Sequence, residues 1–187
     1  MPESSLAAFR EQPFELLRQM EQLAWRAAGA EGEGSGTSEW VGIGFRLGSD
    51  QYLAPREEVR EVMTCPPTTT RIPGVKPWVA GLANVRGQLL TVVDLKSFLG
   101  GATTRPGRET RILVINHRDL AAGLLVDEVL GFRRFDESAR TASTPALELR
   151  CERYLTGAFR QQDQLWPVFA LTRLTENPVF LRAAEDA

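Results

Sequence analysis

The sequence of 187 residues contains one histidine and two cysteines, and this scarcity excludes several classes of catalytic and metal site. No metal can be held by several histidines, and a catalytic triad or a histidine general base would have to use His117. His117 lies in a polar turn between two predicted strands, and we interpret it as a solvated turn residue. Cys65 and Cys151 are far apart and lack the spacing of metal ligands, which is typical of ordinary thiols in a reducing compartment.

Motifs for nucleotide binding and for acid catalysis are missing as well. The sequence has no phosphate-binding Gly-x-x-x-x-Gly-Lys-Ser/Thr loop, and Gly42-x-Gly44 lacks the third glycine of a dinucleotide-binding turn. Adjacent acids such as Asp127 and Glu128 point to opposite faces of a strand, so they cannot act together on one bond. We therefore predict a protein that is not an enzyme and that uses no cofactor and no metal.

Long apolar runs and blocks of like charge are also missing. Each apolar run is short and interrupted, and the N-terminus carries Glu3, Arg10 and Glu11 where a signal peptide needs an apolar core. The formal net charge is -2, and acids and bases are interspersed, so no patch suits a phosphate backbone. These features predict a cytoplasmic protein with no direct membrane insertion and no nucleic-acid partner.

The first 38 residues differ in composition from the rest of the chain. Residues 1–28 are predicted to contain an amphipathic helix that begins at Pro13, because apolar residues recur there at helical spacing: Leu16, Leu17, Met20, Leu23, Ala24 and Ala27. Residues 29–38 are rich in glycine and small polar residues, which predicts a flexible linker. The helix could pack on its own domain, bind a partner protein or lie on a membrane. An excess of acids over bases, with no lysine, disfavours the membrane.

Residues 39–178 form the predicted main domain, and residues 179–187 a C-terminal tail or helix end. Turn residues between β-branched and aromatic runs predict a hairpin around residues 48–50 and further short strands. The predicted strands are Trp40–Leu47, Gln51–Ala54, Leu89–Leu95, Arg111–Asn116, Ala121–Val129 and Leu165–Leu171, and Val59 and Val62 continue the pattern. Short helices are predicted over Leu95–Leu99 and from Pro178. Many short strands with close turns predict a mainly β protein of small barrels rather than a doubly wound sheet.

Several motifs follow one another in order along residues 40–174. They are Val59-Arg60-Glu61-Val62, the long segment from Trp78 to Leu95 with its Asn84-Val85-Arg86-Gly87, the segment from Gly123 to Val129, and Tyr154-Leu155-Thr156-Gly157. Together these motifs resemble the CheW-like domain family. The extra N-terminal segment and the opening residues 40–46 resemble the PilI branch of that family, the CheW-like proteins of chemosensory systems that govern type IV pili and twitching motility.

The resemblance implies a fold and a set of partners. The implied fold is two small SH3-like five-stranded β-barrels packed side by side, to which the residue patterns above add a short N-terminal amphipathic helix and a short C-terminal helix. The implied function is an adaptor at membrane-associated receptor arrays. Its groove between the barrels receives the cytoplasmic tip of a chemoreceptor, and its barrel surfaces bind the regulatory domain of a CheA-type histidine kinase. Contacts with other CheW-like copies are compatible with this role.

The resemblance also implies candidate receptor- or kinase-binding residues, which are Val59, Glu61, Val62, Gly81, Arg86, Val129, Phe132 and Gly157. In the family the matching Glu and Arg lie close together, so Glu61 and Arg86 are expected to form an ion pair, either structural or in direct contact with a partner. Any single apolar position of the set could be core instead. Only several exposed together would mark an interaction surface.

Some residues of these motifs have simpler structural explanations. Gly81, Gly87 and Gly157 are expected to provide positive φ angles or close backbone approach. Asp94 and Asp127 are expected to serve as structural caps and turn residues.

Two other functions remain open from the sequence. A small-ligand-binding or catalytic β-barrel would need an enclosed cavity lined by converging polar groups. A structural protein that caps receptor arrays would contact receptors without touching the kinase.

Overall fold

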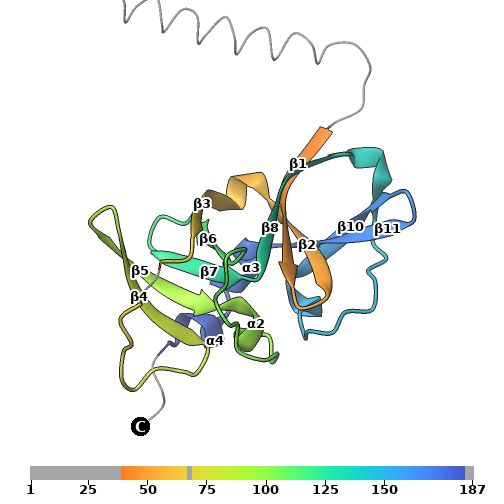
Figure 1. Cartoon of the computed structure of the whole chain (residues 1–187). Coiled ribbons are helices and arrows are strands. Elements are labelled where there is room, and N and C mark those ends of the chain that lie inside the picture. Colours follow the sequence, from red (N-terminus) through yellow and green to blue (C-terminus); the bar gives the residue numbers. More distant parts are fainter. Residues whose placement is uncertain (1–38, 67–68, 184–187) are drawn as a thin grey trace, which may run out of the picture. The chain divides into compact units, whose positions relative to one another are not determined.

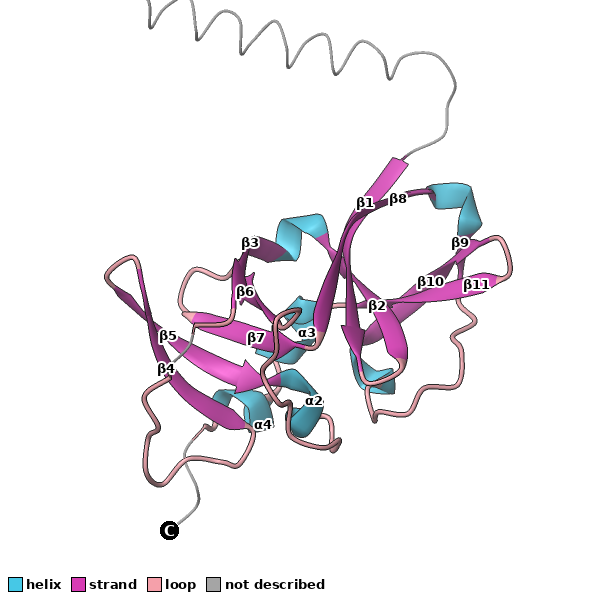
Figure 2. Cartoon of the chain, in the orientation of Figure 1, coloured by secondary structure: helices cyan, strands magenta, loops and turns pink. Residues whose placement is uncertain are grey.

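The computed structural model describes residues 39–66 and 69–183 (Figure 1). The predicted N-terminal helix and linker therefore lie outside the described residues, as do residues 184–187. Within these ranges the chain forms two sheets, with strand orders β8-β1-β2-β11-β10-β9 and β3-β6-β7-β5-β4. Figure 2 shows that strands dominate and that the helices are short. The predicted mainly β fold is confirmed, although one sheet has six strands because it includes a strand of two residues.

The first sheet, which we call barrel A, combines two distant parts of the chain. It contains β1 (Glu39–Leu47), β2 (Asp50–Pro55), β8 (Glu128–Asp136), β9 (Arg140–Thr141), β10 (Leu155–Gln161) and β11 (Gln164–Phe169). The predicted β1–β2 hairpin is present and turns at Gly48, whose φ of 61° favours glycine. The early and late strands meet where β11 pairs with β2 in parallel, at Val168 and Leu53.

The second sheet, which we call barrel B, is one uninterrupted stretch of chain inserted between the two parts of barrel A. It contains β3 (Val59–Thr64), β4 (Val79–Val85), β5 (Gln88–Asp94), β6 (Arg111–Ile115) and β7 (Ala122–Val126). Strands β3 and β4 are the two edges of the sheet. The chain leaving β3 reaches the far edge at Thr70, which exchanges two backbone hydrogen bonds of 2.8 and 2.9 Å with Leu82 of β4. This bridge joins the two edges and closes the barrel.

Short helices connect the strands. They are η2 (Arg56–Glu58), α2 (Leu95–Phe98), η3 (Glu137–Ala139), η4 (Glu152–Tyr154), α3 (Leu171–Thr175) and α4 (Pro178–Leu181). The predicted helix at Pro178 is confirmed as α4, which Asn177 caps by accepting a hydrogen bond from the Val179 amide. Phe180 of α4 is 5% exposed and packs in the core. The described chain therefore stays packed on the domain beyond residue 178.

The described residues form three apolar cores. Barrel A encloses Leu53, Phe135, Phe159, Trp166 and Val168, and barrel B encloses Ala83, Leu90, Val92, Ile112, Val114 and Leu125. The largest core contains residues of both barrels and of α3 and α4, and we call it the shared core. Alternate residues of one strand enter different cores: Ile112 of β6 faces the interior of barrel B, and Leu113 faces the shared core. Because both faces of such strands are buried, their sequences are continuously apolar.

Some predicted elements differ from the observed ones. The prediction of a single strand over Ala121–Val129 is wrong, because the chain leaves barrel B after β7 and enters barrel A at β8, with Asp127 between them. Strand β8 then continues to Asp136, so Phe132 lies within it and not near a strand end. Strands β4 and β10 were matched to family motifs without being predicted as strands. Helix α3 replaces the end of the strand predicted to reach Leu171.

Among the helices in the described ranges, none combines the length and the apolar character needed to span a bilayer.

Candidate functional site

Four of the candidate residues, which we call the apolar strip, lie on the facing sides of the two barrels: Val59, Val62, Val129 and Phe132. Strand register shows this placement, because side chains of directly paired residues lie on the same side of a sheet. Val59 and Val62 of β3 pair with Ile115 and Leu113 of β6, and both of these lie in the shared core. Val129 and Phe132 of β8 pair with Phe45 and Ile43 of β1, which also lie in the shared core. All four side chains thus lie on the faces that the two barrels turn toward each other.

The strip runs from the core to the surface. Val59 is buried, and Val129 is half-buried and packs against the shared core. Val62 is 39% exposed and Phe132 is 65% exposed. Val59 is therefore a core residue that supports the strip without being accessible. The exposed part has one apolar side chain from each barrel.

A basic side chain lies beside the Phe132 ring. The guanidinium carbon of Arg56 lies 5.7 Å from the centre of the Phe132 ring, within reach of a cation–π contact. Arg56 donates a hydrogen bond of 2.9 Å to the backbone carbonyl of Val59. Since η2, with Arg56, links barrel A to β3 of barrel B, this arrangement ties the two ends of the strip together.

The expected ion pair between Glu61 and Arg86 is present. The Arg86 Nη1 atom lies 3.3 Å from Glu61 Oε2, with side chains that are 84% and 25% exposed respectively. Arg86 and Gly87 form the two-residue turn between β4 and β5, and both have positive φ angles, of 51° and 83°. Such a turn suits the twist of a hairpin. The pair therefore connects β3 at one edge of barrel B with the hairpin at the other edge.

This ion pair does not share a face with the apolar strip. Glu61 pairs with Val114 of β6, whose side chain faces the interior of barrel B, whereas Val62 faces the shared core. A hollow of about 450 Å³ surrounds the pair, lined by Arg60, Glu61, Val85, Arg86 and Gln88. The structure thus separates the predicted polar site from the predicted apolar one.

Gly81 and Gly157 occupy equivalent positions in the two barrels. Gly81 has a φ of 137°, and a Cβ atom there would lie 2.5 Å from the carbonyl oxygen of Thr70. Gly157 has a φ of 127°, and a Cβ atom would lie 2.8 Å from the carbonyl oxygen of Thr141. In each barrel a short crossing segment packs directly on the glycine backbone. Both glycines are therefore explained by close backbone approach and by a left-handed φ, as expected.

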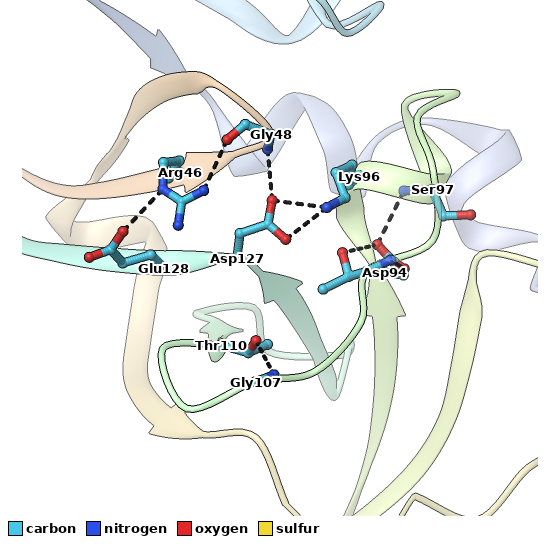
Figure 3. A network of polar contacts seen from close by, with 10 residues as sticks. Arg46, Gly48, Asp94, Lys96, Ser97, Gly107, Thr110, Asp127 and Glu128 are labelled. Atoms are coloured by element: carbon cyan, nitrogen blue, oxygen red, sulfur yellow. Dashed lines mark hydrogen bonds and ion pairs between the residues drawn. The ribbon is translucent and has the colours of Figure 1, made fainter.

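A polar network joins the two barrels at the crossover between β7 and β8 (Figure 3). Asp127 accepts hydrogen bonds of 2.8 and 3.0 Å from Lys96 Nζ on α2 and one of 2.7 Å from the Gly48 amide in the β1–β2 turn. The neighbouring Glu128 accepts one of 3.0 Å from Arg46 Nε. The side chains of Lys96 and Asp127 are 17% and 16% exposed, so this pair is largely shielded from water. Asp127 is structural, as expected, and it fixes the start of β8.

Asp94 has the expected capping role. Its side chain accepts a hydrogen bond of 3.1 Å from the Ser97 amide at the start of α2. It also accepts hydrogen bonds from the amide and the hydroxyl of Thr104, at 2.6 and 2.9 Å. Asp94 is 2% exposed, and these contacts satisfy its charge within the fold.

The described residues contain no group of three or more His, Cys, Asp and Glu side chains that could hold a metal. His117 is exposed and its Nδ1 accepts a hydrogen bond from the Asp119 amide, as a turn residue does. Burial raises the pKa of the Tyr52 phenol and of the Cys151 thiol, which contact each other in the shared core. Both groups therefore stay neutral at physiological pH.

Three connecting side chains were not identified from the sequence. They are Lys96 and Arg46 in the crossover network and Glu58, which accepts hydrogen bonds from the amides of Leu171 and Thr172 at the start of α3. Glu58 lies 113 or more positions from the residues it caps. Lys96 lies 31 positions from Asp127, and Arg46 lies 82 positions from Glu128. No local sequence signal specifies such pairs.

Comparison with known proteins identifies similar chains. The family model described as the CheW-like domain matches residues 41–178. Protein PilI of Pseudomonas aeruginosa is 40% identical over 173 residues, which cover 92% of this chain and 96% of that protein. Chemotaxis protein CheW of Bacillus subtilis is 42% identical over 86 residues, which cover 46% of this chain and 54% of that protein.

A solved structure agrees with the fold. The crystal structure of scaffolding protein TtCheW from Thermoanaerobacter tengcongensis superposes with a TM-score of 0.65 at 24% identity. The superposition covers 75% of this chain and 95% of that chain.

Proposed function

Because the chain belongs to the CheW-like domain family, we propose that it is an adaptor that couples the cytoplasmic tip of a chemoreceptor of the methyl-accepting type to a CheA-type histidine kinase. It acts through the shapes of its surfaces, and it catalyses no reaction. The strong similarity to protein PilI along nearly the whole chain favours a chemosensory system that controls type IV pili and twitching motility.

The observation that carries this proposal is the apolar strip. Its exposed end is formed by Val62 of barrel B and Phe132 of barrel A, and its buried end continues into the shared core. A partner that binds there contacts both barrels at once, and exposed apolar residues grouped in this way mark interaction surfaces. The tip of a helical hairpin would bury Phe132 against apolar side chains of its own.

A binding experiment with Phe132→Ser tests the proposal. Purified chain is titrated with a soluble receptor hairpin fragment and, separately, with the regulatory domain of the kinase. Phe132→Ser is expected to weaken receptor binding by about tenfold or more, as truncation of a central aromatic contact does. Leu89→Ser is the matched control, because Leu89 is also 65% exposed but lies on β5 outside the strip.

The outcomes separate the competing functions. Normal receptor binding by Phe132→Ser would remove the apolar strip from the site. Receptor binding with no measurable kinase binding by the unmodified chain would indicate an array-capping protein instead of an adaptor. Equal losses of receptor affinity in Phe132→Ser and Leu89→Ser would indicate that exposed apolar residues bind the receptor fragment nonspecifically.

A further inference from the structure

A second surface on the molecule combines an aromatic wall with unpaired positive charge. It is a hollow of about 280 Å³ lined by residues at the end of α2, in η4 and at the start of α4. Figure 1 shows α2 and α4 on the lower side of the domain and β3 above them. The lining residues are Trp78, Phe98, Leu99, Gly100, Arg150, Arg153, Tyr154, Asn177 and Val179. We call it the α2–α4 hollow.

The wall of the α2–α4 hollow is rigid. The Trp78 and Phe98 rings meet edge to face with centroids 5.2 Å apart, and both contact Phe180, at 6.1 and 5.4 Å. Phe98 also contacts Tyr154 at 6.2 Å. The amide of Asn177 donates a hydrogen bond to the Tyr154 hydroxyl. Since these rings are anchored in the shared core, the apolar surface exists before any ligand binds.

The charge of the α2–α4 hollow comes from Arg150 and Arg153. Both are exposed, and neither guanidinium has a hydrogen-bond or ion-pair partner among the residues that the structure describes. Both line the hollow, Arg153 from η4 and Arg150 from the chain just before it. The nearby acids Glu152 and Glu176 do not line the hollow. Its charged edge is therefore purely basic.

An exposed apolar residue extends this surface. Val179, at the edge of the hollow, is 58% exposed, whereas Leu181, half a turn further along α4, does not line it. A small anion such as phosphate would use the arginines and leave the aromatic wall and Val179 uncovered. A ligand that matches all of the features has carboxylates next to a bulky apolar side chain.

We propose that the α2–α4 hollow binds a linear acidic segment of a partner protein. An apolar side chain of the segment packs against Trp78, Phe98 and Val179, and its carboxylates accept hydrogen bonds from Arg150 and Arg153. Guanidinium groups bind carboxylates through two parallel hydrogen bonds, which gives such a contact its specificity. The site lies apart from the apolar strip, so a segment bound there leaves the strip free for the partner proposed above.

Selection from a displayed library of random twelve-residue peptides tests this inference and does not require the partner to be identified first. The full chain is expected to enrich peptides in which Asp or Glu flanks Phe, Leu or another bulky apolar residue. A labelled peptide from the enriched set is then titrated by fluorescence polarisation. The double variant Arg150→Glu/Arg153→Glu should weaken binding by about a hundredfold, or about tenfold for each guanidinium removed from a peptide carboxylate.

Matched variants separate this site from general attraction to positive charge. Arg118→Glu/Arg160→Glu changes the net charge equally at exposed arginines outside the hollow and should leave binding unchanged. Val179→Ser should weaken binding several-fold, whereas Leu181→Ser, on the same helix but outside the lining, should have a smaller effect. Circular dichroism spectra of all variants should match the unmodified chain, because every substituted side chain is exposed.

Three results would overturn the inference. The first is a selection that enriches no acidic motif, and the second is equal binding by the Arg150→Glu/Arg153→Glu and Arg118→Glu/Arg160→Glu variants. The third is a concentration-dependent dimer that Arg150→Glu/Arg153→Glu abolishes, because a second copy of this chain would then occupy the hollow.

Discussion

The ion pair between Glu61 and Arg86 shows how little a contact distance says about function. Arg86 is 84% exposed, and exposed ion pairs contribute only about 0.2–1 kcal/mol to the free energy of unfolding. Its position in the tight β4–β5 turn nevertheless presents the guanidinium to any partner that approaches this edge of barrel B. Replacing Arg86 should therefore change the free energy of unfolding little and the coupling of receptor to kinase strongly.

We predict that Arg86→Ala uncouples kinase control while lowering the free energy of unfolding by less than about 1 kcal/mol. Kinase autophosphorylation in arrays reconstituted with receptor gives the first quantity, and urea unfolding gives the second. Glu61→Gln serves as the comparison, because it removes the ion pair and keeps the arginine. If receptor and kinase binding and kinase regulation all stay normal in Arg86→Ala, the polar part of the site has been assigned incorrectly.

Tyr52 and Cys151 in the shared core make the stability of the fold depend on alkaline pH. Burial raises the pKa of both groups above their ordinary values of 10.0 and 9.0. In the unfolded chain each loses its proton at its ordinary pKa, while the folded chain retains it, so the unfolded state binds fewer protons. Stability is therefore fully present below pH 9 and falls above it.

We expect the free energy of unfolding to decline above pH 9 by up to about 1.4 kcal/mol per pH unit for each deprotonated group. Urea unfolding at intervals of half a pH unit measures the decline. Tyr52→Phe should reduce the slope above pH 10 and cost about 1 kcal/mol at neutral pH, because its hydrogen bonds are lost. An unchanged slope in Tyr52→Phe would contradict the assignment of the decline to this phenol.

At the scale of elements, the crossover from β7 to β8 determines how barrel A meets barrel B. Asp127 lies between the two strands, and Lys96 of α2 and Gly48 of the β1–β2 turn hold its carboxylate. The side chains of Lys96 and Asp127 are only 17% and 16% exposed and lose most of their hydration on folding. Each charge is therefore stabilised in the fold mainly by its partner.

We predict that Lys96→Met lowers the free energy of unfolding by about 1–3 kcal/mol, because it leaves the Asp127 carboxylate partly buried without its counter-ion. Lys96→Arg should retain most of the stability. Asp127→Asn should cause a similar loss alone and little further loss when combined with Lys96→Met, which a double-mutant cycle from urea unfolding measures. Strictly additive losses would show that the two side chains are not coupled.

Elements with one regular pattern were predictable, and elements shaped by tertiary packing were not. The alternation and turn around Gly48 give the β1–β2 hairpin directly. The apolar run from Ala121 to Val126 resumes at Val129 after only two acidic residues, so the sequence does not reveal where the chain passes from barrel B to barrel A. Strand β7 is buried on both faces and therefore shows no alternation. In β4 and β10, the bulges next to Gly81 and Gly157 interrupt the period of two.

The candidate site was predictable only in part, for a related reason. Resemblance to a family supplied Val62 and Phe132, but strand register, which no local pattern encodes, shows that each lies on the face that its barrel turns toward the shared core. The same register places Glu61 on the other face of β3. The partners of Lys96 and the unpaired state of Arg150 and Arg153 depend on the complete fold.

At the scale of the whole molecule, the shared core makes the two barrels one cooperative unit. Within residues 39–66 and 69–183 it contains 24 buried residues, against 6 inside barrel B and 5 inside barrel A. Separating the barrels would expose most of the buried apolar surface, so neither interior is large enough to be stable alone.

We predict one unfolding transition for the domain. In a Cys65→Ser background, labelling of the buried Cys151 thiol by a thiol reagent should follow the same urea dependence as far-ultraviolet circular dichroism. Calorimetric and van't Hoff enthalpies should agree. Labelling at lower urea concentrations than the loss of strand signal would show that the barrels separate before they unfold.

The insertion of barrel B within barrel A also sets an order of events during translation. All strands of barrel B lie in one stretch, so each has its pairing partners available once β7 has left the ribosome. The nascent β1 and β2 must wait for β10 and β11, and the hydrogen bond between Gln51 and Gln164 spans 113 positions. Until then Phe45 and Tyr52 have no Phe169 to pack against, so the β1–β2 hairpin leaves the ribosome with aromatic side chains that its own sheet does not yet cover.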